Sequence, residues 1–315
     1  MSTANLTDWQ AKQVQLFRED IGKCESIQSL VSLCREFITL SSQAWYVRGC
    51  SSAYRKKLDD LRSGKPPRLI LAIDLKAIAW LAHVRAMKRE NGSGVTEFLE
   101  IMKEIKSEPK FAGKYSHIVF ADECESGGWR YAATPEWKSK RQEAPGEFVE
   151  LMVKIRAALE KWGSNVIRIE RMEADDILSS IAASYALAGD KVCMICQDKD
   201  LYQVLGPQTN MYWTGQFFTR ETLMQKHNLE ASQWVDYLCL TGKNDVTGAA
   251  GIGDVYAKKL LMTFGSFSNC CSSYKQMEKQ FSKKIADSVI AFEEQYPLCK
   301  RVHSLVQDLE IEVLF

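Results

Sequence analysis

Several features that would place this chain in a common class of protein are missing from its sequence. No apolar run approaches the roughly 20 residues of a membrane-spanning helix, and residues 1–20 are polar and charged, unlike a secretory signal. The formal net charge over 315 residues is only +1, so no global field attracts nucleic acid, and any phosphate binding must come from local patches. We therefore expect an ordinary globular protein in a reducing, cytoplasmic setting.

The residue patterns of several catalytic classes are also absent. The four histidines are scattered, without cysteines at zinc-finger spacing, and no Gly-Lys-Ser/Thr loop supports the use of ATP. The ten cysteines do not have the arrangement of a disulfide framework in a chain of this length. Cys193 and Cys196 have the spacing of a redox motif, but they lie in an apolar strand, where positions three apart point to opposite faces. We expect buried thiols there, as at Cys239.

The hydrophobic pattern divides the chain into three parts. Residues 1–67 are predicted to form a helical extension that ends in the linker Ser63-Gly64-Lys65-Pro66-Pro67. Residues 68–218 alternate between strands and helices, with helices over 78–89, 95–105, 146–162 and 175–187. This alternation predicts an α/β core, a mostly parallel central sheet flanked by helices. Residues 219–315 change to helices and tight glycine turns, with one helix over 255–264.

Carboxylates follow each of four predicted strands, at the edge where an open parallel sheet binds its ligands. Seven such residues stand there: Asp74, Asp122, Glu173, Asp175, Asp176, Asp198 and Asp200. So many like charges repel unless a cation lies among them, and hard divalent cations prefer oxygen ligands. Each acid alone is equally explained as a helix-start or turn residue. Together they predict a Mg²⁺ or Mn²⁺ site built for phosphoryl chemistry.

A basic stretch follows Asp122 and contains aromatic residues. Its cations are Arg130, Lys138, Lys140 and Arg141, and its aromatic residues are Trp129, Tyr131 and Trp137. Positive charge beside aromatic faces suits a single-stranded nucleic acid. The alternative is an exposed loop with ordinary surface lysines.

A glycine turn precedes the helix over 255–264. Gly248, Gly251 and Gly253 allow close approach of the backbone, and amides at a helix start suit phosphate. By itself the pattern is more typical of a tight turn between two helices. Lys258 and Lys259 follow on the helix, and they fit either phosphate contacts or a solvated face.

Three motifs in order resemble the 5′-nuclease (flap endonuclease) superfamily: 172–177 (Met-Glu-Ala-Asp-Asp-Ile), 197–201 (Gln-Asp-Lys-Asp-Leu) and 248–253 (Gly-Ala-Ala-Gly-Ile-Gly). The likeness covers roughly residues 68–267 and is closest to the 5′–3′ exonuclease domain of bacterial DNA polymerases and the free-standing bacterial and phage enzymes. It implies a PIN-like nuclease core with a C-terminal helix–hairpin–helix motif. It also implies metal-dependent hydrolysis of DNA phosphodiesters near single-strand/duplex junctions, with one or two Mg²⁺ or Mn²⁺ ions and K⁺ at the hairpin. The implied partners are DNA with 5′ flaps and a separate polymerase or repair protein, at the bacterial nucleoid.

The resemblance also implies roles for individual residues. The seven acids would hold the metals, and Lys138 would stabilise charge on the scissile phosphate. Arg130 and Arg141 would hold the flap in a gateway over the active site. The remaining DNA contacts would come from Trp137, Lys140, Gly248, Gly251, Gly253, Lys258 and Lys259.

One segment departs from the family pattern, which has Gly-Asp-x-x-Asp-Asn before the glycine turn. Here Gly242 is followed by Lys243, and Asn244 or Asp245 is the candidate for the second acid, with Asp245 a predicted metal ligand. Lys243 would put a fixed positive charge where a cation sits in the family. This leaves open an enzyme with one tightly bound metal, one that gains a second metal only with DNA, or a slow enzyme.

Two other functions remain open at this point. One is a branched-DNA-binding repair protein whose nuclease activity is weak or lost, which the Lys243 segment favours. The other is a metal-dependent ribonuclease with the same acidic sheet edge, against which the glycine hairpin argues because it suits duplex DNA.

Overall fold

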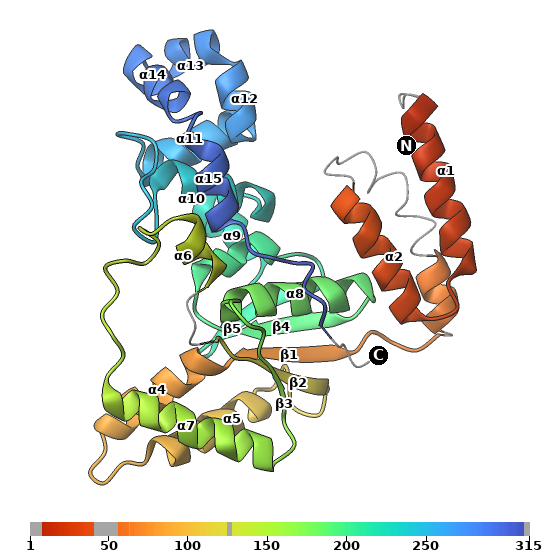
Figure 1. Cartoon of the computed structure of the whole chain (residues 1–315), viewed down its shortest axis with the longest axis vertical. Helices are drawn as coiled ribbons and strands as arrows, with labels where there is room; N and C mark the ends of the chain where they lie inside the picture. The colour runs from red at the N-terminus through yellow and green to blue at the C-terminus, as the bar shows by residue number, and fades with distance from the viewer. Residues whose placement is uncertain (1–7, 41–55, 63, 125–127, 312–315) are drawn as a thin grey trace.

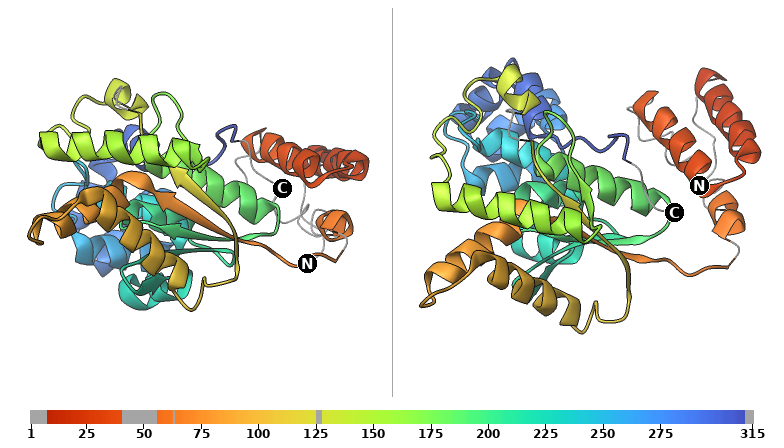
Figure 2. Two further views of the ribbon diagram at one scale, coloured as in Figure 1. Left: turned by 90° about the horizontal axis from the view of Figure 1, so that it is seen from below. Right: turned by 60° about the horizontal axis from the view of Figure 1, so that its bottom comes forward.

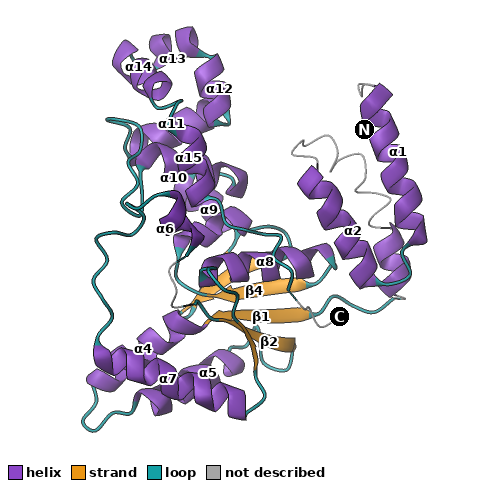
Figure 3. Cartoon of the chain, in the orientation of Figure 1, coloured by secondary structure: helices purple, strands orange, loops and turns teal. Residues whose placement is uncertain are grey.

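The centre of the molecule is a six-stranded sheet with the strand order β3-β2-β1-β4-β5-β6 (Figures 1 and 3). The computed structural model describes residues 8–40, 56–62, 64–124 and 128–311. The strands are β1 (Leu69–Asp74), β2 (Tyr115–Ala121), β3 (Asn165–Ile167), β4 (Lys191–Ile195), β5 (Thr209–Trp213) and β6 (Gln216–Phe218). All neighbours are parallel except β5 and β6. The predicted α/β fold class is thus confirmed, and the short β5–β6 hairpin adds a pair of strands that the sequence pattern did not predict.

Helices cover both faces of the sheet (Figure 2). One face carries α8 (Ala174–Leu187), and the other carries α4 (Leu75–Met87), α5 (Gly94–Ser107) and α7 (Gly146–Lys161). The apolar side chains of β4 divide between these layers because successive residues alternate in direction. Cys193 packs in the cluster with α4, α5 and α7, and Cys196, the residue directly after β4, packs in the cluster with α8. Both thiols are buried and unpaired, as predicted for an apolar strand.

The helices that follow the sheet stack above α8 (Figure 1). They are α9 (Arg220–His227), α10 (Trp234–Thr241), α11 (Asp254–Phe264), α12 (Phe267–Ser272), α13 (Tyr274–Gln280), α14 (Lys283–Ala291) and α15 (Tyr296–His303). After α15 the chain returns along α8, where the hydroxyl of Ser180 donates to the carbonyl of Val306 at 2.8 Å. One hydrophobic cluster runs from the sheet through α8 into these helices, so they are fastened to the core.

The N-terminal segment forms α1 (Asp8–Lys23) and α2 (Ile27–Leu40), followed by helical residues 56–62. Phe17, Leu30 and Leu58 are buried in a small cluster of their own, against which Leu187 of α8 packs. Asp190 joins this segment to the sheet, since it pairs with both Arg62 and Arg68. Within the described residues, no helix is both long and apolar enough to span a membrane.

Candidate functional site

Three carboxylates meet at the carboxyl edge of the central strands. Asp74 ends β1 and caps α4, accepting a hydrogen bond from the Ala77 amide at 2.9 Å. Asp198 follows β4 and accepts from the Asp200 amide at 2.9 Å, and Asp175 lies in the first turn of α8. All three line one cavity of about 230 Å³. Since β2 and β3 lie on one side of β1, and β4 and β5 on the other, the cavity lies at the topological switch point, where open sheets bind ligands.

Like charges and burial dominate the electrostatics of this cavity. Burial raises the pKa of Asp74 to about 6, helped by the nearby carboxylates Glu123 and Asp198. The pKa of Asp175 is well above its ordinary value, because it is buried and faces Asp198 and Asp74. These carboxyls are costly to ionise as they stand, and a bound cation would relieve that cost.

Asp198 behaves differently from its two neighbours. Its burial would raise the pKa, but Lys243 and the Asp200 amide outweigh burial and hold the pKa below its ordinary value. The pKa of Lys243 is raised, because Asp200 and Asp198 outweigh its own burial. Asp198 and Lys243 therefore form a stable pair of opposite charges inside an otherwise crowded group of acids.

Asp122 was predicted as a metal ligand, but it points away from the cavity. In the register of the sheet, Asp74 is level with Ala121. Side chains alternate between the two faces, so Asp122 projects towards α7 while Asp74 projects towards α8. There it is almost fully buried and pairs with Arg156 at 2.9 Å and Arg168 at 2.7 Å. Asp122 is thus a structural anchor for α7 and the chain after β3.

The residues of the cavity that were not predicted from the sequence include Glu123, Lys76 and Trp80. Glu123 lines the cavity beside Asp74 and pairs with Lys76. Trp80 also lines the cavity and leaves 40% of its surface exposed. Lys76 and Trp80 lie four residues apart on α4, the spacing that places side chains on one helical face. The spacing of Lys76 and Trp80, on a helix that begins directly after the strand-terminal Asp74, was the sequence signal that could have placed these two residues at the cavity.

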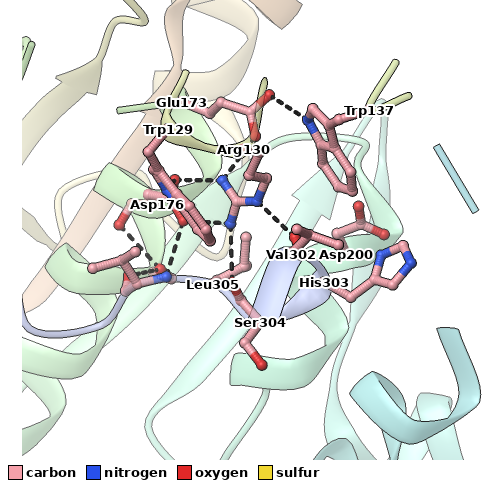
Figure 4. A network of polar contacts seen from close by, with 12 residues as sticks. Trp129, Arg130, Trp137, Glu173, Asp176, Asp200, Val302, His303, Ser304 and Leu305 are labelled. Atoms are coloured by element: carbon pink, nitrogen blue, oxygen red, sulfur yellow. Dashed lines mark hydrogen bonds and ion pairs between the residues drawn. The ribbon is translucent and has the colours of Figure 1, made fainter. Parts of the chain in front are cut away.

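Arg130 was predicted to hold a nucleic acid strand, and the structure corrects this (Figure 4). It is 1% exposed and lies in α6 (Trp129–Ala133). Its guanidinium makes bonds of 2.6 Å and 2.8 Å to the two oxygens of Asp176 and also donates to Glu173. The carbonyls of Val302 and Ser304 accept its remaining hydrogen bonds. Arg130 and Asp176 thus form a buried structural pair, closed off from DNA.

The rest of the basic stretch divides between buried and accessible residues. Trp137 is 2% exposed and packs edge-on against His303, so it presents no face to a base, contrary to prediction. Lys138 is buried, pairs with Glu173 and lines the cavity together with Arg141. The side chain of Lys140 is 85% exposed, and its Nζ lies 3.7 Å from Oδ1 of Asp245. The positions of these three residues, Lys138, Lys140 and Arg141, are compatible with the roles predicted for them, and those roles stay predictions.

The segment after Gly242 brings a cation to the acids instead of a carboxylate. The Lys243 Nζ is 3.3 Å from Oδ1 of Asp198 and also contacts Oδ1 of Asp200. Asn244 donates to the other oxygen of Asp200 at 3.1 Å. Asp245 accepts instead from the Lys140 amide at 3.2 Å, so it fastens the segment around Lys140 and is not among the residues that line the cavity.

A divalent ion fits the chemistry of the cavity at one position. In the described part of the chain, no three His, Cys, Asp or Glu side chains are already arranged to hold an ion. Asp74, Asp175 and Asp198 offer only oxygen ligands, which hard cations prefer, and the pKa values of Asp74 and Asp175 are raised by burial first and by the neighbouring carboxylates second. Three further predicted ligands are held by cations of the chain: Glu173 by Lys138, Asp176 by Arg130 and Asp200 by Lys243.

The glycine turn before α11 separates into a structural and an accessible part. A Cβ on Gly248 would lie 2.4 Å from the Gly242 nitrogen, so two backbones touch there. Gly251 has φ +72° with open space around it, and Gly253 is open as well. Lys258 pairs with Asp254 at 2.7 Å, whereas Lys259 is exposed. Within this turn and the helix after it, Gly251, Gly253 and Lys259 are therefore the exposed members of the predicted DNA contact.

The fold and site define an open α/β protein with an acidic, lysine-bearing cavity at its switch point. Residues 69–231 match the model of the 5′–3′ exonuclease N-terminal resolvase-like domain. That match covers more than half of the chain, which therefore belongs to this family, and the resemblance predicted from the sequence motifs is confirmed.

Relatives and solved structures agree with this assignment. The flap endonuclease Xni of Colwellia psychrerythraea is 27% identical over 200 residues, which cover 62% of this chain and 67% of that protein. The DNA polymerase I of Bacillus subtilis is 28% identical over 221 residues, 68% of this chain but only 24% of the polymerase. The T5 5′-exonuclease with bound zinc has a TM-score of 0.62 at 17% identity, covering 76% of this chain and 90% of that one. The catalytic core of Rad2 with DNA substrate has a TM-score of 0.52 at 18% identity, covering 82% and 83%.

Proposed function

We propose that this chain is a divalent-metal-dependent, structure-specific 5′ nuclease that hydrolyses DNA phosphodiesters near single-strand/duplex junctions. The observation that carries the proposal is the meeting of Asp74, Asp175 and Asp198 in one cavity beside Lys138 and Arg141. The family match, the relatives called flap endonucleases and the fold shared with T5 5′-exonuclease support it. We propose the cytoplasm, at the nucleoid, as its place of action.

In this proposal the chain's own residues divide the work of the reaction. Asp74, Asp175 and Asp198 would hold Mg²⁺ or Mn²⁺, which when bound supplies an activated water and stabilises charge on the phosphate. Lys138 and Arg141 reach the same cavity and would bind the non-bridging oxygens of the scissile phosphate. Trp80, half-exposed at the cavity wall, would stack on an unpaired base of the 5′ strand.

The duplex part of the substrate would lie on the turn before α11. Gly251 and Gly253 expose backbone amides at the start of that helix, where phosphate is favoured. Lys259 adds an exposed positive charge. K⁺ at this hairpin and contact with a separate polymerase are further parts of the proposal.

The test is cleavage of a 5′-end-labelled flap duplex with Mg²⁺, with Mn²⁺ and with chelator. Asp175→Asn removes one proposed ligand and should abolish cutting, whereas Asp59→Asn, at an exposed position away from the cavity, is the matched control. An RNA or hybrid flap tests the ribonuclease alternative. Equal cutting by Asp175→Asn and the wild-type chain would contradict the assigned site.

A second candidate function is a DNA-binding protein with little nuclease activity. The ion pairs of Lys243, Lys138 and Arg130 with the family's acids favour it, because each pair withdraws a ligand. Junction binding without cutting in either metal would support this candidate over the first.

A further inference from the structure

The most unusual feature of the site is an ammonium group held among its acids. Lys243 contacts one oxygen each of Asp198 and Asp200. Its side chain is 35% exposed, and that of Asp200 is only 8% exposed. Solvent therefore screens this pair less than it screens an ion pair between exposed side chains.

The backbone holds Lys243 in this position from several sides. Gly242 has φ +71°, and Lys243 forms an isolated bridge with Val246. The carbonyl of Asn244 accepts from the Lys138 amide at 2.9 Å, and its side chain donates to Asp200. The turn that carries Lys243 is therefore fastened both to the backbone of Lys138 and to Asp200, the acid that Lys243 neutralises.

The contacts also leave part of Asp198 available. Lys243 and the Asp200 amide both donate to Oδ1 of Asp198, and neither of them uses Oδ2. Oδ2 can therefore face an ion held with Asp74 and Asp175. Asp200, by contrast, has Oδ1 in contact with Lys243 and Oδ2 with Asn244.

From this arrangement we infer that Lys243 takes the place of a second divalent ion. The chain would then bind one ion, at Asp74, Asp175 and Asp198, and would supply the second positive charge from its own side chain. The inference rests on the proposed nuclease function and specifies its metal requirement. A second ion at Asp200 would have to lie beside the ammonium, and two cations at contact distance repel strongly. An ammonium also donates three hydrogen bonds, so Lys243 can hold a phosphate oxygen without activating water.

The experiment counts bound ions directly, apart from any cleavage. Mn²⁺ binding to the full chain is measured by calorimetry and by the electron paramagnetic resonance of free Mn²⁺. The variants are Lys243→Asp, Lys243→Met and the control Lys284→Asp, an exposed lysine on α14. We expect one ion in the wild-type chain and the control, and two in Lys243→Asp. Lys243→Met should bind Mn²⁺ about tenfold more tightly than wild type, because it removes a positive charge that contacts the proposed ligand Asp198 and repels the ion.

The outcomes separate this inference from the function on which it rests. Two ions per wild-type chain, or variants that bind like the wild type while folded by circular dichroism, overturn the inference and leave a flap-cutting nuclease intact. No ion in the wild-type chain at millimolar Mn²⁺ overturns both. Lys243→Met keeps the test sound if Lys243→Asp does not fold, because it adds no charge.

Discussion

Asp74 ends β1 and Asp122 directly follows the neighbouring strand β2, yet their side chains point to opposite faces of the sheet. Asp74 is level with Ala121, so Asp122 lies one residue further along and its side chain turns towards Arg156 of α7. Glu123, the next residue, returns to the side of Asp74 and lines the cavity. Because successive side chains alternate in direction, Glu123 lines the cavity, whereas the predicted ligand Asp122 anchors α7.

This exchange predicts different effects for two adjacent substitutions. Glu123→Gln should weaken Mn²⁺ binding and cleavage by about tenfold, because it removes a charge beside Asp74. Asp122→Asn should leave metal affinity unchanged and lower the free energy of unfolding by about 2 kcal/mol, the worth of a hydrogen-bonded charged group. Calorimetry and urea unfolding of both variants check this. A loss of metal binding in Asp122→Asn alone would restore the original assignment.

The buried pair of Arg130 and Asp176 predicts a loss of stability when it is broken. Arg130→Met leaves the fully buried Asp176 carboxylate without its main partner. Removing one member of such a pair lowers the free energy of unfolding by about 3–5 kcal/mol. Urea unfolding of Arg130→Met beside the wild-type chain measures this loss.

A double-mutant cycle separates pairing from packing. Arg130→Met with Asp176→Leu should recover part of the loss, since no charge is left buried. If Arg130→Met unfolds like the wild type and instead loses only DNA affinity, Arg130 contacts the substrate after all.

The raised pKa of Asp74 predicts that ionisation of its carboxyl group destabilises the folded, metal-free chain at neutral pH. Burial, with Glu123 and Asp198, raises the pKa to about 6 from 3.8. In the unfolded chain Asp74 has its ordinary pKa of 3.8 and ionises first as pH rises. The free energy of unfolding therefore falls between about pH 4 and pH 6, and it stays lowered at higher pH. Asp74→Asn should therefore stabilise the metal-free chain at pH 8 by about 1–3 kcal/mol. Equal free energies of unfolding for Asp74→Asn and the wild-type chain at pH 8 would contradict the raised pKa of Asp74.

The contact of Gly248 with Gly242 predicts that Gly248 is structural. Gly248→Ala would place a methyl group 2.4 Å from a backbone nitrogen, and such overpacking costs about 3 kcal/mol. Gly146→Ala, at the start of α7 with nothing within 4 Å, is the control and should be neutral or slightly stabilising. Thermal unfolding of the two variants makes the comparison.

The sequence predicted the local elements well because their signals are local. The strand-terminal position of Asp74 and the helix after it follow from a run of apolar residues, and β1 and α4 confirm them. The burial of Arg130 had no such signal. Its partners lie 46 residues away at Asp176 and 172 and 174 residues away at Val302 and Ser304. The direction of Asp122 depended on a strand register that alternation alone does not fix.

The return of the chain along α8 has a consequence for the order in which the protein matures on the ribosome. Arg130 and Asp176 are both made long before their partners at Val302, Ser304 and Val306. Until residues 302–306 have been synthesised, the beginning of α8, which carries Asp175, lacks their hydrogen bonds to Arg130 and Asp176. A nascent or truncated chain that stops before Val302 would contain every residue of the cavity but not the segment that holds the start of α8 in place.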